Sequence, residues 1–483
     1  MKSNNDNNCM NTELTRRQFI KKSSFVSMGL ISGLGVTSSI FAANKTQLTN
    51  LEHSDESTIS ISTFDMDATP PVGSDLAYDV MKGVWDLGLR AKGLVLTGCG
   101  YPIVLCAIDW IGIGNESYDI FREKMAEAAG TVPERVALHT LHQHDSVWCD
   151  FGAEKILREN DIDPQCFDGT FARSFLDQLC VRIRKSISET KKISHVGFGE
   201  APVKKVASNR RIFMPDGHVE ERWTACTDEK LRQEPEGIID PILSLISFWD
   251  ENRPVAVLSY YATHPQSYYR TGIANPDFPG LARFIRQAAL PEALMIHFNG
   301  AGGDVGAGKY NDGSKENRLI LASRLVDGME MAWNNTDKFP LTKDFITWKV
   351  AKLTLPPAVY LSKLKEQLAL DKSLYLENRD YARKMAWYSR CLAGKTIDVS
   401  CLSIGKLRVL HMPAELFVEY QLTAKSMRPD LKIVIAAYGD YGPGYICTEL
   451  AMKQGGYETT DRACNVAPDS EKAIINVFAK LLS

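Results

Sequence analysis

His142 and His144 follow directly on an apolar run at 135–141 that is predicted to be a β-strand. Residues two apart in an extended chain point to the same side, so both imidazoles are expected to face one site. His264 follows a second predicted strand at 255–262. A single histidine at a strand end is more often a structural hydrogen-bonding residue. The three together suggest a metal site, because imidazole is one of the ligands that zinc takes in catalytic sites.

A carboxylate and a phenol also follow predicted strands, as the histidines do. Glu415 comes soon after a predicted strand at 407–411, and Tyr445 ends the segment that follows the strand at 433–437. In open α/β sheets, ligands bind beyond the carboxyl ends of the strands. Zinc held there by imidazole and carboxylate would lower the pKa of a bound water to about 7 and supply a nucleophile. The residues by themselves therefore favour a metal-dependent hydrolase.

A glycine-rich loop at 299–308 follows the predicted strand at 294–298. It fits neither GxxxxGK[ST] nor GxGxxG, so it does not indicate a phosphate site.

The elements that must position these residues alternate between strand and helix. This alternation predicts an α/β fold, a mostly parallel mixed sheet flanked by helices, as one large catalytic domain over 58–483. The segment 193–260 alternates in a more β-like way and is expected to add antiparallel strands. The predicted strands are 101–108, 135–141, 255–262, 294–298, 407–411 and 433–437, and the predicted helices are 117–129, 171–190, 281–289, 317–334 and 361–370.

The composition is that of a soluble globular protein. The chain has 483 residues, a net charge of −3, 44% hydrophobic and 24% charged residues. No basic patch indicates a nucleic-acid partner. The 11 cysteines form no CxxC pair. Cys106 and Cys401 lie in apolar runs and are expected to be buried free thiols, while a disulfide among Cys149, Cys166 and Cys180 is left open.

The N-terminus has the order of an export signal. Arg16 and Arg17 precede an apolar run at 25–41, which ends at the small residues Ala42 and Ala43. The paired arginines indicate a twin-arginine signal over 1–43, followed by a polar linker at 44–57. The run is marginal for spanning a bilayer. We therefore expect a periplasmic or secreted protein, associated with the membrane only if the signal stays uncleaved.

Several segments, in order along the chain, resemble those of the neutral ceramidase family. The matching segments are Asp67-Ala68-Thr69-Pro70-Pro71-Val72-Gly73, Leu141-His142-Gln143-His144, Asn209-Arg210, His264, Pro413-Ala414-Glu415, Tyr445-Ile446-Cys447-Thr448 and Tyr457-Glu458.

This resemblance implies a role for each residue. The zinc (Zn2+) ligands would be His142, His264, Glu415 and Tyr445. Around them, His144, Arg210 and Tyr457 would act in catalysis, and the last two would donate hydrogen bonds to an oxyanion. The implied function is an exported zinc-dependent hydrolase that cleaves an amide (N-acyl) bond by attack of zinc-bound water, on a small-molecule or lipid-like amide substrate.

Two departures from the family pattern keep the substrate open. Gly306 stands where the family has a serine near the zinc, and nothing indicates that Ser267 or Ser314 replaces it. The chain also ends at Ser483, without the C-terminal immunoglobulin-like domain of well-known family members. One alternative is a non-catalytic relative that binds a lipid or glycan. Another is a metal-dependent hydrolase of phosphate or sulfate esters with Asp109 as a ligand, although Asp109 is more simply a structural residue.

Overall fold

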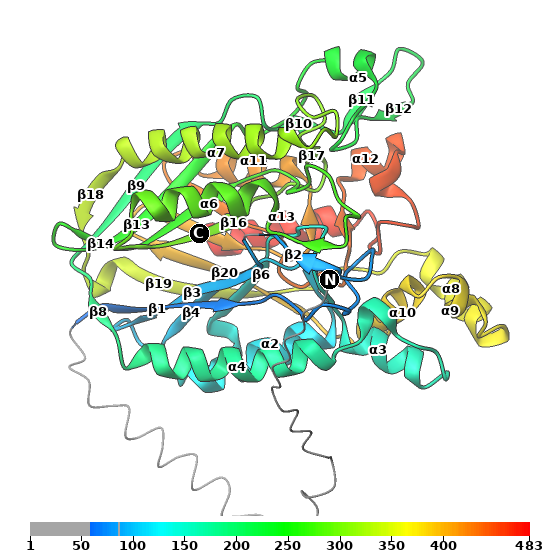
Figure 1. Cartoon of the computed structure of the whole chain (residues 1–483), viewed down its shortest axis with the longest axis horizontal. Coiled ribbons are helices and arrows are strands. Elements are labelled where there is room, and N and C mark those ends of the chain that lie inside the picture. Colours follow the sequence, from blue (N-terminus) through cyan, green and yellow to red (C-terminus); the bar gives the residue numbers. More distant parts are fainter. Residues whose placement is uncertain (1–57, 86) are drawn as a thin grey trace, which may run out of the picture. The chain divides into compact units, whose positions relative to one another are not determined.

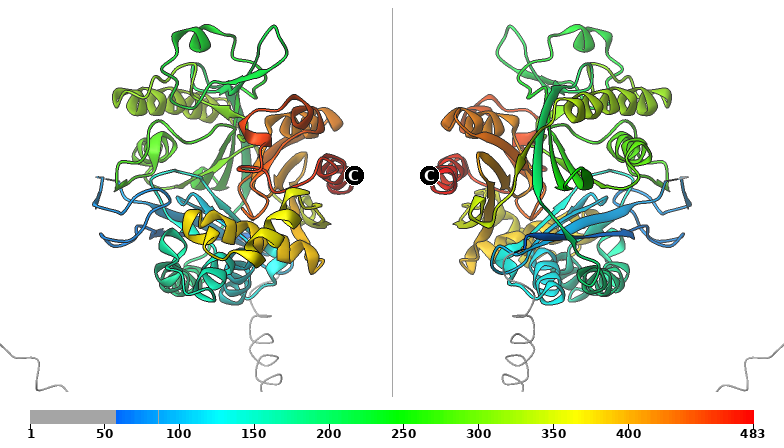
Figure 2. Two further views of the ribbon diagram at one scale, coloured as in Figure 1. Left: turned by 90° about the vertical axis from the view of Figure 1, so that its right-hand side faces the viewer. Right: turned by 90° about the vertical axis from the view of Figure 1, so that its left-hand side faces the viewer.

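The computed structural model describes residues 58–85 and 87–483, which form three larger β-sheets, with helices on their outer faces, and several two-stranded sheets (Figures 1 and 2). The expected export signal at 1–43 and the linker at 44–57 lie outside the described residues. Within the described part, no helix has the length and apolar character needed to cross a membrane.

Each of the three sheets has a single parallel pair, which lies at one edge. The first sheet has the strand order β6-β4-β3-β1-β8, and only β4 and β6 are parallel. The second has the order β16-β14-β13-β9-β18 with β14 and β16 parallel, and the third β19-β20-β21-β23 with β21 and β23 parallel.

The bounds of the strands are as follows: β1 Ser60–Asp67, β3 Arg90–Thr97, β4 Ile103–Ile108, β6 Val136–Thr140, β8 Lys191–Lys192, β9 His195–Pro202, β13 Ile242–Asp250, β14 Arg253–Tyr261, β16 Leu294–Asn299, β18 Asp337–Pro340, β19 Ile346–Leu353, β20 Ile397–Ile404, β21 Leu407–His411 and β23 Lys432–Ala436.

The predicted α/β class is confirmed, and so are the helices that flank the sheets, but the prediction of mostly parallel strands was wrong. The other pairs in the three sheets are antiparallel. Strands β13 and β14 are separated only by residues 251–252, and β20 and β21 only by 405–406. Connections this short make hairpins, because a parallel crossover needs a dozen or more residues. Gly405 has φ of 56° in the second of these turns, a conformation that favours glycine.

The helices cover the sheets in pairs. Helices α2 and α4 pack on the first sheet, α6 and α7 on the second, and α11 and α13 on the third. Helices α3, α8, α9 and α10 gather at one end of the sheets (Figure 1). Their bounds are α2 Glu116–Ala129, α3 Phe151–Arg158, α4 Thr170–Ile187, α6 Asp277–Ala289, α7 Glu316–Asn334, α8 Tyr360–Leu370, α9 Leu374–Glu377, α10 Asp380–Leu392, α11 Val418–Met427 and α13 Ser470–Leu482.

The three sheets share one core and meet at their parallel edges. Side chains from all three, including Leu105, Phe248 and Val409, form one buried apolar cluster. Asn299, the last residue of β16, joins the residues that follow β6 and β23. Its side-chain amide donates to the carbonyl of Leu141 at 2.7 Å, and its backbone carbonyl accepts from the Ala437 N–H at 2.9 Å. The carboxyl ends of the three parallel pairs therefore converge on one place.

The cysteines of the described residues are all free thiols, including Cys149, Cys166 and Cys180. The buried thiols predicted at Cys106 and Cys401 are confirmed.

Acid is expected to destabilise the fold through His139, a buried β6 residue whose Nδ1 hydrogen-bonds the carbonyl of Ala437. Burial lowers the pKa of His139 from 6.5 to about 4. The folded state therefore binds fewer protons than the unfolded state between these values, and stability falls as the pH falls from about 6.5 to 4. The shift lowers the free energy of unfolding at pH 4 by about 3 kcal/mol relative to its value at pH 7. Urea unfolding of metal-free protein at pH 7 and pH 4 measures it, and the His139→Gln variant should show a smaller loss.

Candidate metal centre

Four short segments beyond the converging strands carry the predicted metal ligands. His142 follows β6, and His264 follows β14. Strand β22 (Glu415–Leu416) pairs in parallel with β24 (Tyr445–Ile446), which places Glu415 directly beside Tyr445. All four side chains are buried. His142 has φ of 63°, an uncommon conformation for a residue with a side chain, and such backbone conformations cluster at functional sites.

The carboxylate of Glu415 faces both imidazoles. Its Oε2 lies 3.3 Å from Nε2 of His142 and 3.3 Å from Nε2 of His264, and it has no hydrogen-bond partner among the described residues. In a tetrahedral site with metal–ligand bonds of about 2.0–2.1 Å, neighbouring ligand atoms lie about 3.3–3.4 Å apart. The distances from Glu415 Oε2 to the two imidazole nitrogens fit a tetrahedral metal ion.

Both imidazoles are held in the orientation that a metal ligand needs. Nδ1 of His142 donates to the carbonyl of Ile111 at 2.7 Å, and Nδ1 of His264 donates to that of Gly302 at 2.9 Å. With the proton on Nδ1, the lone pair of Nε2 points toward Glu415, as is usual for metal-binding histidines. A Cβ at position 302 would lie 2.9 Å from the backbone of Thr263, so the glycine permits this close approach. The glycine-rich loop thus supports a histidine.

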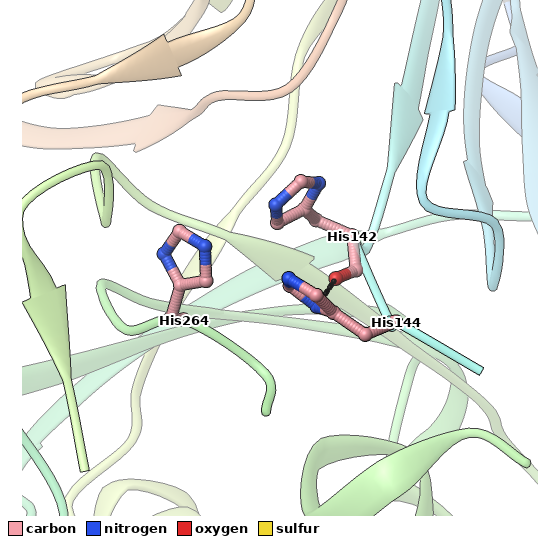
Figure 3. Close-up of side chains that lie close together, drawn as sticks. All are labelled: His142, His144 and His264. Carbon is pink, nitrogen blue, oxygen red and sulfur yellow. Dashed lines mark hydrogen bonds between the residues drawn. The ribbon is translucent and has the colours of Figure 1, made fainter. Parts of the chain in front are cut away.

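His144 lies beside this pair, so that three imidazoles surround one point (Figure 3). A metal-binding atom from each of His142, His144 and His264 lies within 4.8 Å of the other two. Nδ1 of His144 hydrogen-bonds the carbonyl of His142 at 3.1 Å, which leaves its Nε2 free. Burial, together with His142 and Arg210, lowers the pKa of His144 well below its usual value. The geometry admits His144 either as a further ligand or as a neutral base.

Arg210 and Tyr457 complete the predicted site on the side of Tyr445. Nη1 of Arg210 donates to the hydroxyl of Tyr445 at 3.2 Å, and its Nη2 lies 3.2 Å from Glu458. The Tyr457 ring lies 6.0 Å from that of Tyr445. All seven predicted site residues line one cavity of about 730 Å³, a volume typical of small-molecule sites.

Solved structures of known function share this arrangement of sheets and helices, although no protein-family model and no curated protein matches the chain. A crystal structure of neutral ceramidase from Pseudomonas aeruginosa superposes with a TM-score of 0.63 at 14% identity, over 88% of this chain and 74% of that one. A structure of ceramidase complexed with C2 gives 0.62 at 13% identity, over 88% and 75%. The chain has a neutral ceramidase fold. The fold expected from the resemblance is confirmed.

In this chain, the side chain of Thr224 occupies the space that a side chain at position 306 would need. A Cβ on Gly306 would lie 2.4 Å from Cγ2 of Thr224. Thr224 donates from its hydroxyl to Gln266, which lines the cavity. Ser267 instead accepts a hydrogen bond from Arg318, and Ser314 bonds to Asp312 at the surface. Neither serine lines the cavity, so neither supplies a hydroxyl in place of the missing one.

Asp109 is part of the scaffold. Its two carboxylate oxygens accept from Arg283 at 2.8 and 2.6 Å, and the pair is buried away from the cavity lining. The structural interpretation of Asp109 is therefore the correct one.

Tyr441 is a site residue that the sequence analysis missed. Its hydroxyl donates to Oε1 of Glu415, the oxygen that faces away from the histidines. Its ring stacks on His142, with centroids 5.4 Å apart. Burial and the charge of Glu415 raise the pKa of Tyr441 well above its usual value, so the donor keeps its proton. The only sequence signal was its place in the segment between the 433–437 strand and Tyr445.

Replacing Tyr441 by phenylalanine is expected to weaken metal binding by about 10- to 100-fold, the usual cost of losing an outer partner of a ligand. The ring and its packing on His142 remain, whereas the hydrogen bond that orients Glu415 is lost. Competition with a chelator of known affinity measures the effect. Unchanged affinity in a folded Tyr441→Phe protein would show that Tyr441 does not orient the carboxylate.

Proposed function

We propose that this protein is an exported, zinc-dependent hydrolase that cleaves an N-acyl amide bond. The observation that carries the proposal is the placement of Glu415 Oε2 at 3.3 Å from two imidazole nitrogens in the lining of a cavity. Nitrogen and carboxylate ligands in this number are typical of catalytic zinc. The proteins with the similar fold are named as ceramidases, and ceramide is an N-acyl amide.

Four side chains would hold the ion: His142, His264, Glu415 and Tyr445. A metal ion in this position supplies a nucleophile at neutral pH by lowering the pKa of water, and it polarises a carbonyl. Among the chain's own groups, Arg210 would donate to the oxygen of the amide carbonyl as negative charge develops there. Nε2 of His144 would accept a proton from the attacking water and return it to the departing amine nitrogen. Tyr457 would orient the substrate beside Arg210.

Metal analysis and turnover together test the proposal. The purified mature protein should contain about one zinc per chain, lose turnover of N-acyl amides on dialysis against a chelator, and regain it with zinc. A protein without bound metal, or turnover that is insensitive to the chelator, would refute it. Faster turnover of the matching esters would indicate an ester hydrolase instead. Fractionation of the producing cells and N-terminal sequencing of the mature chain test export and cleavage near Ala42 or Ala43.

A further inference from the structure

The walls of the cavity contain no branched aliphatic side chain. Among the described residues that line it, none is Leu, Ile, Val or Met, while eight are Tyr, Trp or Phe and four are Arg. A site for a long acyl chain would normally be lined mainly by apolar side chains. This cavity instead combines flat aromatic faces with hydrogen-bonding groups.

The aromatic side chains form two platforms beside the candidate metal centre. Tyr78 lies nearly parallel to His144, with ring centroids 5.7 Å apart, and Tyr269 packs edge-on against Tyr78 at 5.1 Å. On the side of Arg210, Trp223 packs against Tyr457 at 5.0 Å. Tyr78, Tyr269 and Trp223 are 38%, 37% and 45% exposed, so each keeps an uncovered surface. Rings held in place in this way present rigid faces at little entropic cost.

The remaining wall is polar. Four consecutive residues at the junction of α9 and α10 line the cavity, namely Glu377, Asn378, Arg379 and Asp380, and Arg462 lines it as well. Within the described part of the chain, neither Arg379 nor Arg462 lies within ion-pair distance of a carboxylate. Arg379 donates from Nε to the carbonyl of Asp163 at 2.8 Å, which leaves its two Nη groups, and the guanidinium of Arg462, available as donors to a ligand. In Figure 1 the α9–α10 segment lies at the same end of the sheets as β11 (Arg211–Phe213) and β12 (Val219–Glu221), which precede Trp223.

We propose that the cavity takes an N-acylated amino sugar, with pyranose rings stacked on Trp223 and Tyr78 and hydroxyl groups bonded to the α9–α10 wall. A sugar ring has an apolar face of C–H groups and a rim of hydroxyls, which match an aromatic platform bordered by donors and acceptors. The inference rests on the proposed amide hydrolysis. Water would add across the acyl carbon–nitrogen bond, which breaks to give a carboxylic acid and the free amino sugar.

Binding and turnover are measured separately with two probes. The first is N,N′-diacetylchitobiose, followed by calorimetry and by release of acetate. The second is a short-chain ceramide in mixed detergent micelles, followed by release of the fatty acid. The zinc-loaded protein is expected to bind and deacetylate the sugar and to act poorly on the ceramide. The Trp223→Ala variant should raise KM for the sugar about tenfold and leave kcat nearly unchanged, because it removes a stacking face.

Two further variants serve as controls. Trp223→Phe keeps an aromatic face and should recover most of the affinity. Tyr101→Ala removes an exposed aromatic side chain, 61% exposed, that does not line the cavity, and should change nothing. Preference for the ceramide, with Trp223→Ala affecting neither probe, would overturn the inference and leave the proposed hydrolase standing. Sugar binding that depends on Trp223, without any acetate release, would leave the sugar site standing and overturn the proposed amide hydrolysis.

Discussion

The His264→Ala protein is expected to lose its bound metal and, with it, all measurable amide hydrolysis. His264 presents Nε2 to Glu415 at 3.3 Å and is fixed behind by the carbonyl of Gly302. Removing it deletes one ligand outright, so metal affinity should fall by more than the roughly 10- to 100-fold that loss of an outer partner costs. Metal content after gel filtration and the rate of amide hydrolysis are the two measurements.

The His195→Ala protein is the matched control, because His195 begins β9 and does not line the cavity. It should retain metal and activity. A His264→Ala protein that still binds zinc with the affinity of the unaltered chain would contradict the ligand assignment, and His144 would then be the first candidate for the second nitrogen ligand. Circular dichroism of both variants establishes that the fold is preserved.

The sequence predicted which residues come together better than it predicted the direction of the strands that carry them. The candidate ligands were expected at the carboxyl ends of strands 135–141, 255–262, 407–411 and 433–437, and each of these runs belongs to a parallel pair in the structure. The rule that ligands bind beyond such ends therefore applied. The number of antiparallel strands joined by hairpins was underestimated, because a short buried strand has the same apolar pattern whichever way its partner runs.

Residues that act through distant contacts had no comparable signal. Tyr441 supports Glu415 only because β22 and β24 pair and bring the preceding loop back over the carboxylate. Similarly, Trp223 and Arg379 come together at one cavity from segments about 150 residues apart. No local pattern encodes such a meeting. The resemblance carried information only for residues inside its motifs.

The side chains around Gly306 explain why a glycine stands where the family has a serine. The sequence alone indicated a missing hydroxyl. In the structure, Thr224 occupies the space that a side chain at 306 would need. Its hydroxyl donates a hydrogen bond to the side chain of Gln266. Thr224 has therefore taken the place of a side chain at 306, and its partner Gln266 lines the cavity.

Replacing Arg210 by methionine is expected to lower kcat by about 100- to 1000-fold, the usual cost of removing one oxyanion donor. The guanidinium is buried, contacts the Tyr445 hydroxyl at 3.2 Å and lines the cavity. Its loss removes the group placed to stabilise charge on the carbonyl oxygen, while His142, His264 and Glu415 stay intact. Arg210 is also an outer hydrogen-bond partner of Tyr445, so metal affinity should fall by at most about 10- to 100-fold, and kinetics at saturating zinc separate this effect from that of His264→Ala. Steady-state kinetics with metal analysis measure both.

The fold is expected to survive the change, because Glu458 keeps Arg211 as an ion-pair partner at 3.3 Å. The Arg210→Lys protein is the matched control. Lysine keeps the positive charge but has no planar fork, so it cannot reach Tyr445 and Glu458 together, and only part of the rate should return. If Arg210→Met left kcat unchanged and raised only KM, Arg210 would bind the substrate equally in the ground and transition states. The oxyanion role would then be wrong.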